Sequence, residues 1–289
     1  MKKFLFKISR WKEGIPFYQQ IHFFFEKTNE AAIAAYSGQT AYMLILSFFP
    51  FFLFLLTLLQ LTPLSKSYLL TAMQLFLPES LSTFVLSLIE NLYQNQFYSL
   101  LPITVLLSLW LGSKSFLSLI RGLNSIYGIE ETRNWFVLRF WSVLYTILFA
   151  ILLLSTLMVL VFGNSLFLHL KKYFPILEES LLPFISLRSV IAFLIMLLFF
   201  MLLYKSIPNF PKEQKVKYTS QLPGALLATS GWLGFSFLYS YYIDNFSNYI
   251  VIYGSMAAIA FLMIWLYACM YIFFLGGLVN YLLQNRNTL

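Results

Sequence analysis

The chain has 289 residues, of which 60% are hydrophobic and only 10% are charged. Soluble domains carry charge on about 25% of their residues, so this composition excludes a water-soluble protein and indicates an integral membrane protein. The formal net charge of +8 follows from Lys and Arg placed beside the membrane, so nucleic acid is not an expected partner.

Six stretches without charged residues follow one another along the chain, and a helix needs about 20 apolar residues to cross the hydrocarbon. Five stretches are long enough. The fourth reaches this length if it starts near Leu181 and carries Arg188 near one end, where a long side chain extends to the headgroups. The predicted fold is therefore an all-α bundle of six membrane-spanning helices, at about 36–62, 96–120, 136–162, 181–204, 219–242 and 252–281.

The segments outside these helices set the orientation. With both chain ends placed in the cytoplasm, 15 of the 19 Lys and Arg lie on the cytoplasmic side, as the positive-inside rule requires. Residues 1–35 then form a cytoplasmic interfacial segment and 282–289 a cytoplasmic tail. Residues 15–30 are aromatic and amphipathic and are expected to lie along the membrane surface. Residues 66–95 predict two short interfacial helices, with a re-entrant hairpin as the alternative.

The first predicted helix carries polar side chains at helical spacing, although no charged residue interrupts it. They form a stripe with one methionine and one proline: Tyr36, Thr40, Met43, Ser47 and Pro50, with Gln39 beside it. Lipid offers polar groups no partners, so the stripe is expected to face the protein interior. Its side chains either form hydrogen bonds between packed helices or line a polar path through the protein. If it lines a path, Thr40→Leu with Ser47→Leu should abolish function and leave membrane insertion intact.

The second predicted helix becomes steadily more polar toward its end, where Lys114 and Asn124 lie. Lys114 either extends to the inner headgroups or contacts an anion or a lipid headgroup. The loop that follows contains Glu130 and Glu131, which are expected to be solvated.

Glycines and one asparagine indicate turns and close helix contacts. Gly122 and Gly128 suit a turn after the second helix, whereas Gly224 and Gly231 allow a neighbouring helix to approach closely. Asn280 lies near the end of the last helix and either bonds to another helix or joins the polar path.

The sequence contains few residues that could form a catalytic site. The single cysteine, Cys269, lies in an apolar run, and the two histidines, His22 and His169, are far apart. No acidic residue lies deep in a predicted span, and no phosphate-binding loop or metal motif is present. No cofactor or metal is therefore expected and the protein is predicted not to be an enzyme. A membrane hydrolase would need a loop acid or histidine such as His169, Glu178 or Glu179.

An ordered set of motifs over about residues 20–285 resembles the YihY/virulence factor BrkB family. The motifs are AAYSGQTAYMLILSFFPFFL, LNSIYGIEE, LYKSIPN, LPGALLAT, VIYGSMAAIAFLMIWLY and LGGLVN. The positions that match the family pattern are Tyr36, Ser47, Pro50, Asn124, Tyr127, Pro208, Pro223, Gly224, Tyr253, Gly254, Gly276 and Asn280. Leu278 stands where the family often has a Glu, which argues against proton coupling at that position.

The resemblance implies a bacterial inner-membrane protein with six spans and both ends in the cytoplasm. The family was once labelled ribonuclease BN, but this sequence has no nuclease metal cluster of carboxylates or histidines. We expect a transporter, or a factor that translocates lipids or other amphiphiles, whose path is lined by Tyr36, Gln39, Thr40, Ser47, Lys114, Asn124 and Asn280. A non-transporting scaffold in envelope assembly is the alternative. Membrane lipids are the expected partners, and a homo-oligomer is compatible with the sequence.

Overall fold

The computed structural model describes residues 17–60, 101–152, 188–211, 216–246 and 255–288. Within these ranges all regular structure is helical. We refer to the helix over Trp135–Leu152 as helix 135–152. The elements in chain order are α2 (Phe17–Glu30), α3 (Ile33–Gln60), α6 (Leu101–Tyr127), helix 135–152, α9 (Arg188–Ser206), the short 3₁₀ helix η3 (Thr219–Gln221), α10 (Leu222–Phe246) and α12 (Ser255–Thr288).

Several described helices are long and apolar enough to cross a membrane. Four candidate spans lie in the described ranges: Ile33–Phe54 in α3, Pro102–Tyr127 in α6, helix 135–152, and Ile259–Gln284 in α12. A shorter apolar helix, Phe193–Ser206, lies in α9. Large apolar side chains also point outward, such as Phe237 at 72% exposure and Leu106 at 67%, as expected for a surface that faces lipid. The predicted class, an all-α membrane protein, is therefore confirmed.

The observed helix bounds extend several predicted ones. α6 ends at Tyr127 rather than near residue 120, and α12 continues to Thr288 through most of the predicted tail. α3 runs through Pro50 without a break in the assigned helix. Residues 66–95, for which interfacial helices or a re-entrant hairpin were predicted, lie outside the described residues, as do the ends of the third and the start of the fourth predicted span.

Local geometry explains where α6 stops. Gly128 adopts a positive φ of 66°, which glycine reaches without a steric penalty. Its N–H bonds to the Ser125 carbonyl, and the Ile129 N–H bonds to the Asn124 carbonyl. This pair of bonds is the Schellman termination, in which a left-handed residue ends a helix. The turn predicted at Gly128 is confirmed, whereas Gly122 lies inside α6.

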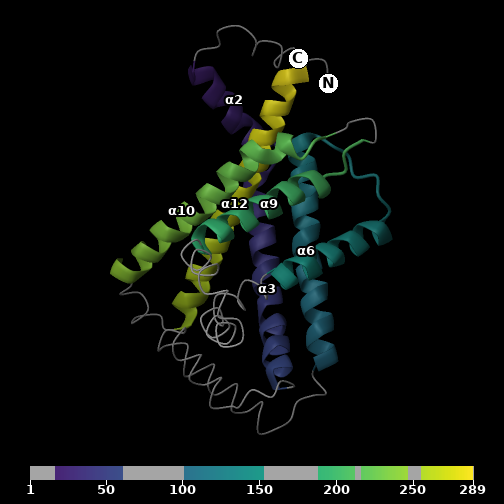
Figure 1. The fold of residues 1–289 in the computed structure, drawn as a ribbon, viewed down its shortest axis with the longest axis vertical. Helices are drawn as coiled ribbons and strands as arrows, with labels where there is room; N and C mark the ends of the chain where they lie inside the picture. Colours follow the sequence, from purple (N-terminus) through teal and green to yellow (C-terminus); the bar gives the residue numbers. More distant parts are fainter. Residues whose placement is uncertain (1–16, 61–100, 153–187, 212–215, 247–254, 289) are drawn as a thin grey trace, which may run out of the picture.

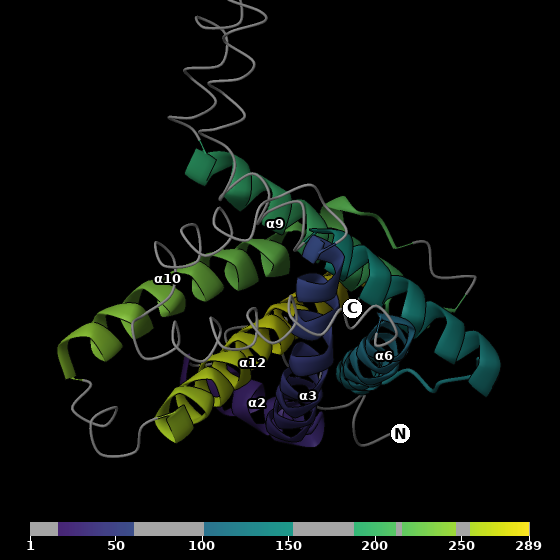
Figure 2. The same cartoon turned by 90° about the horizontal axis from the view of Figure 1, so that it is seen from below.

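Two helix pairs organise the described part of the chain. α3 and α6 run side by side, and α10 and α12 form the second extensive pair and run in opposite directions (Figure 1). α12 also packs against α3 and so joins the two pairs, as the view from below shows (Figure 2). α2 lies at the end of the molecule where α12 finishes (Figure 1). The end of α6 meets the end of α9 and the start of α10, through the bonds of Asn124 with Asn209 and of Tyr127 with Gln221.

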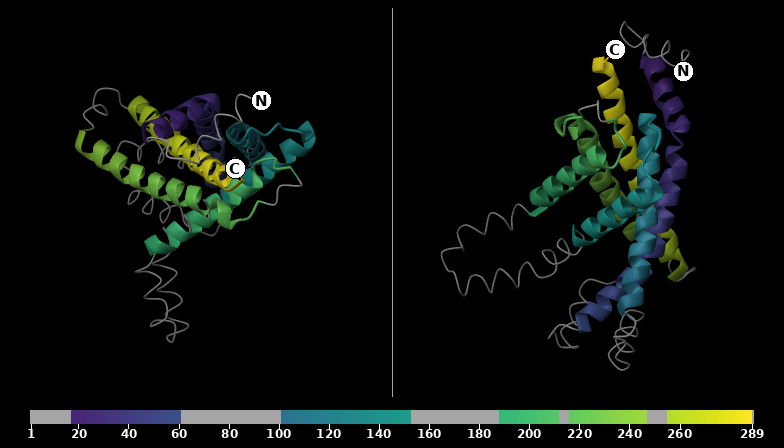
Figure 3. Two further views of the ribbon diagram at one scale, coloured as in Figure 1. Left: turned by 90° about the horizontal axis from the view of Figure 1, so that it is seen from above. Right: turned by 90° about the vertical axis from the view of Figure 1, so that its right-hand side faces the viewer.

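Helix 135–152 and α9 extend together to one side of the α3, α6 and α12 bundle, as the right-hand view in Figure 3 shows. Each of the two helices places a tyrosine in the core: Tyr145 in the middle of helix 135–152 is nearly buried, and Tyr204 near the end of α9 is fully buried. The Tyr145 hydroxyl donates to the Ser206 carbonyl at 2.9 Å, which ties helix 135–152 to the end of α9. The core is continuous between these helices and the bundle, and its fully buried members include Ile120, Leu123 and Phe274.

Candidate functional site

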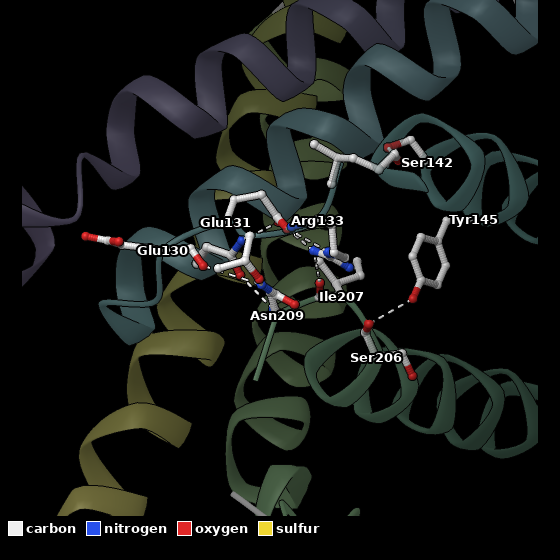
Figure 4. A network of polar contacts seen from close by, with 11 residues as sticks. Glu130, Glu131, Arg133, Ser142, Tyr145, Ser206, Ile207 and Asn209 are labelled. Atoms are coloured by element: carbon white, nitrogen blue, oxygen red, sulfur yellow. Dashed lines mark hydrogen bonds and ion pairs between the residues drawn. The ribbon is translucent and has the colours of Figure 1, made fainter. Parts of the chain in front are cut away.

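A set of four polar residues, which we call the polar clamp, fastens the loop after α6 to the end of α9. It comprises Asn124, Glu131, Arg133 and Asn209. Arg133 makes two side-chain bonds to the Glu131 carboxylate, at 2.7 and 2.6 Å, and a third to the Ile207 carbonyl at 3.2 Å (Figure 4). Asn124 donates to Glu131 at 2.8 Å and accepts the Asn209 backbone N–H at 2.9 Å.

Glu130 and Glu131 were both expected to be solvated, and for Glu131 this expectation is wrong. Glu130 is exposed, as predicted, but the Glu131 side chain is only 20% exposed and paired with Arg133. Burial, the largest single influence, raises the pKa of Glu131, but the bonds from Arg133, its charge and the bond from Asn124 together hold that pKa below its ordinary value of 4.5. Arg133 binds this carboxylate bidentately, which is the strong form of such a pair.

We expect Glu131→Gln to lower stability at neutral pH and to make stability less sensitive to acid. The carboxyl has a lower pKa in the folded state, so its contribution is present above pH 4.5 and is lost as the pH falls through the folded pKa. The pair is partly exposed, so the loss at neutral pH should be about 1 kcal/mol. Thermal unfolding in mild detergent from neutral to acid pH measures it. The matched control is Glu130→Gln, which changes an exposed neighbour; equal acid sensitivity of wild type and Glu131→Gln would refute this account.

A second polar arrangement lies where α10 meets α12. The Asn280 side-chain oxygen accepts the Gly224 N–H at 2.7 Å and is fully buried. The amide group of Asn280 thereby satisfies one of the N–H groups that every helix start leaves unpaired. Gly224 and Gly276 lie against each other, and a Cβ on Gly276 would stand 2.5 Å from the Gly224 carbonyl oxygen. The Tyr204 hydroxyl donates to the Phe273 carbonyl at 2.6 Å in the same region.

The polar stripe of α3 lies mainly against α6. Thr40 is fully buried and its hydroxyl donates to the Tyr36 carbonyl at 2.7 Å, within its own helix. The Ser115 hydroxyl reaches across from α6 to the Thr40 carbonyl at 3.2 Å. The Ser118 hydroxyl lies 3.2 Å from the Gln39 side-chain oxygen, although Gln39 is otherwise exposed. The bonds from Ser115 and Ser118 join α6 to α3.

A cavity of about 500 Å³ lies among the helices of the described part of the chain. α3, α6, helix 135–152, α9, α10 and α12 all contribute to its wall. The wall is almost wholly apolar and strongly aromatic; its rings include Phe116, Phe200, Phe273, Trp232 and Trp265. Phe48 and Ile151 belong to the wall and are also about half exposed. The cavity therefore reaches the outer surface between α3 and helix 135–152.

The hydroxyl groups in the cavity wall are already bonded. Ser47 donates to the Leu44 carbonyl, Ser108 to the Val105 carbonyl and Thr146 to the Ser142 carbonyl, each at 2.8 to 2.9 Å. Ser115 bonds across to α3, as described above. A molecule in this cavity therefore meets aromatic and aliphatic surface and few free donors.

The predicted path residues occupy separate places. Ser47 lies in the cavity wall, Thr40 and Gln39 lie at the α3–α6 contact, Asn124 belongs to the polar clamp and Asn280 caps α10. The structure places Tyr36 at the same contact, where its carbonyl accepts the Ser118 hydroxyl of α6 at 3.4 Å. Lys114 is half-buried on α6 beside Trp110, and Tyr253 and Gly254 lie outside the described residues. That all of these residues form one polar path remains a prediction.

Of the remaining motif positions, Tyr127 and Pro208 lie near the clamp, whereas Pro50 and Pro223 lie in α3 and at the start of α10. The Tyr127 ring lies edge-on to Phe210 at 4.9 Å and its hydroxyl is 3.2 Å from the Gln221 oxygen. Pro208 is buried next to Asn209, whereas Pro223 in the first turn of α10 is exposed. Pro50 is half-buried within α3.

The sequence did not reveal Glu131 and Asn209 as partners of Asn124, nor the bonds from Arg133 to Glu131 and Ile207, nor the aromatic cavity wall. No local signal marks Arg133, because its acceptor at Ile207 is 74 residues away. Aromatic residues make up 20% of the chain, so those that line a cavity are not distinguished by type from those that face lipid.

The helices, their apolar outer surface and the candidate spans define a multi-pass helical membrane protein. The sequence matches the Virulence factor BrkB family over residues 24–289, and the chain belongs to this family.

The ribonuclease-like protein YfkH of Bacillus subtilis is 33% identical over 253 residues, which cover 88% of this chain and 90% of that protein. UPF0761 membrane proteins are also similar: one from Photobacterium profundum is 39% identical over 87 residues, covering 30% of this chain and 26% of that protein. Another, from Prosthecochloris aestuarii, is 26% identical over 254 residues, covering 85% and 56% respectively. No solved structure matches this chain.

Proposed function

We propose that this protein is a six-span transporter that moves a lipid or another amphiphile whose apolar chain occupies the cavity. Each of the six predicted spans overlaps a described helix, with α9 and α10 taken as the fourth and fifth. The excess of Lys and Arg in the segments placed at the cytoplasmic side supports an orientation with both ends inside the cell.

The observation that carries this proposal is the apolar cavity. Its volume of about 500 Å³ falls in the range of ligand sites in proteins. Apolar cavities exclude water and accept apolar molecules. The wall combines aromatic rings with hydroxyls that are already bonded, so it favours a hydrocarbon chain over a polar solute.

The position of the cavity supports entry from the membrane rather than from water. Its wall continues into exposed apolar side chains of α3 and helix 135–152, including Phe48 and Ile151. A lipid chain could therefore enter sideways while its headgroup stays at the surface. Ser47, the predicted path residue in this wall, would contact the chain.

We expect Ala150→Trp to stop transport without preventing folding. Ala150 lies in the cavity wall, and an indole in its place would occupy the space that the substrate chain needs. The assay is transbilayer movement of lipids with fluorescent headgroups in vesicles containing the purified protein. Ala150→Trp should reduce the transport rate by about tenfold or more. This is the reduction expected if the indole weakens substrate binding by about 1.4 kcal/mol or more.

The matched control is Leu148→Trp on the same helix. Leu148 is 42% exposed and does not line the cavity, so this variant should transport at the wild-type rate. Equal transport by wild type and Ala150→Trp would refute the cavity as the path. Absence of transport in all three proteins would favour the scaffold alternative.

A further inference from the structure

Two cations share one indole ring on the outer face of α6. The Arg139 guanidinium carbon lies 4.0 Å from the centre of the Trp110 ring, and the Lys114 ammonium nitrogen lies 5.9 Å from the same centre. The two charges are therefore at most about 10 Å apart. Arg139 also donates to the Trp110 carbonyl at 3.2 Å, which holds helix 135–152 against α6 at this point.

Neither cation has an anionic partner in the described part of the chain. α6 and helix 135–152 contain no Asp or Glu. The ion pairs found in the described residues join other groups, such as Arg133 with Glu131 and Lys27 with Glu30. The Nε atom of Arg139 is covered and has no hydrogen-bond partner. The pair thus carries two positive charges without a counter-charge in the described residues.

The surroundings of this pair are apolar and face outward. Lys114 is thirteen residues from either end of α6, so it lies at the middle of a candidate membrane span. Trp110 is 51% exposed, and Phe140 and Trp141, which follow Arg139, are 65% and 39% exposed. An unpaired charge within a span is unfavourable and marks a functional group in most cases. A bound anion would remove this penalty and the repulsion between the two cations.

We propose that Lys114, Arg139 and Trp110 form a binding site for the phosphate group of an anionic amphiphile held in the membrane. A phosphate forms bonds of about 2.8 Å to each cation, so one group can bridge them after modest movement of the flexible Lys114 side chain. The exposed rings beside Arg139 would contact the attached chains. Arg121, exposed two turns further along α6, adds positive charge to the same face.

This site is separate from the cavity. The residues of α6 that line the cavity, such as Ser108, Gly112 and Ser115, lie on the opposite side of that helix from Trp110 and Lys114, as a spacing of 3.6 residues per turn requires. The proposal therefore does not rest on the transport function, and either could fail while the other holds.

Native mass spectrometry tests the site on the full-length protein. Wild type is titrated with phosphatidylglycerol and phosphatidylcholine of identical chains, and the two association constants are compared. We expect wild type to prefer phosphatidylglycerol by about tenfold, and Lys114→Gln with Arg139→Gln to lose that preference. Equal binding of the two lipids by wild type, or an unchanged preference in the double variant, would overturn the proposal.

Two further variants keep the test decisive. Lys217→Gln removes an exposed cation away from the site and should retain the preference. Lys114→Arg with Arg139→Lys keeps both charges and should also retain it, and an unchanged melting temperature of the Gln double variant shows that its loss of preference does not come from misfolding. Competition with inorganic phosphate tests whether the site takes free phosphate or only a phosphate that is part of a lipid headgroup. Displacement of phosphatidylglycerol shows that the phosphate alone suffices, and its absence shows that the lipid chains contribute.

Discussion

Replacement of Gly224 by alanine should unfold or severely destabilise the protein. The new Cβ would stand closer to the Gly276 carbonyl oxygen than side-chain carbons ever do, and 2.5 Å from the Asn280 amide. The obstacle is backbone of the neighbouring helix, so α10 and α12 must separate to relieve it. Overpacking of this kind costs about 3 kcal/mol or more, and the separation would also break the Asn280 bond to the start of α10.

The same helix provides a matched control for this prediction. Gly234 has no atom within 4 Å of where a Cβ would lie, so Gly234→Ala should leave stability unchanged or raise it slightly through better helix propensity. Thermal unfolding of both variants in mild detergent compares them directly. Similar melting temperatures for Gly224→Ala and wild type would contradict the close contact of α10 and α12.

Asn124→Ala should have the second largest effect on stability. The change removes the bond to the Glu131 carboxylate and leaves the Asn209 backbone N–H without its acceptor. Asn124 is only 4% exposed, so water replaces these bonds poorly. The loss should be about 2 to 4 kcal/mol, which combines one charge-assisted bond with one buried unpaired group.

Thr132→Ala is the control for the polar clamp. It removes a single exposed bond from the Asn209 side chain at 2.9 Å and should cost less than about 0.5 kcal/mol. Thermal unfolding measures both variants, and limited proteolysis of the loop after α6 reports whether it detaches from the end of α9. A loop equally resistant in Asn124→Ala and wild type would show that the clamp does not hold it.

Helix existence was predictable from the sequence because uncharged runs of sufficient length mark lipid-spanning helices. Helix ends were less predictable. α6 continues past residue 120 because the polar side chains of its last turns, including Ser118 and Asn124, bond to α3 and to the loop rather than to water. Gly122 suggested a turn, but its lack of a side chain instead lets Phe274 approach, with a ring carbon 2.6 Å from where a Cβ would lie.

The candidate site was predictable only in part. Helical spacing placed Thr40 and Ser47 on an inward face, and both are buried. The same spacing could not show that their hydroxyls bond to the preceding helical turn. Asn280 was recognised as a polar group between helices, but its acceptor role at Gly224 depends on how α12 packs across α10, 56 residues earlier in the chain. Long-range contacts of this kind have no local sequence signal.

The most direct test of the account is to identify what occupies the cavity in the native membrane. A photoreactive benzoylphenylalanine in place of Phe200, which lines the cavity, should form a covalent adduct with an amphiphile when membranes are irradiated. The same probe at Phe274, buried in the core outside the cavity wall, should form none, and at exposed Phe237 it should capture bulk lipid. Mass analysis of the Phe200 adduct would then identify the substrate class. A probe at Phe200 that captures no amphiphile, while the Phe237 probe captures lipid, would contradict an amphiphile-binding cavity.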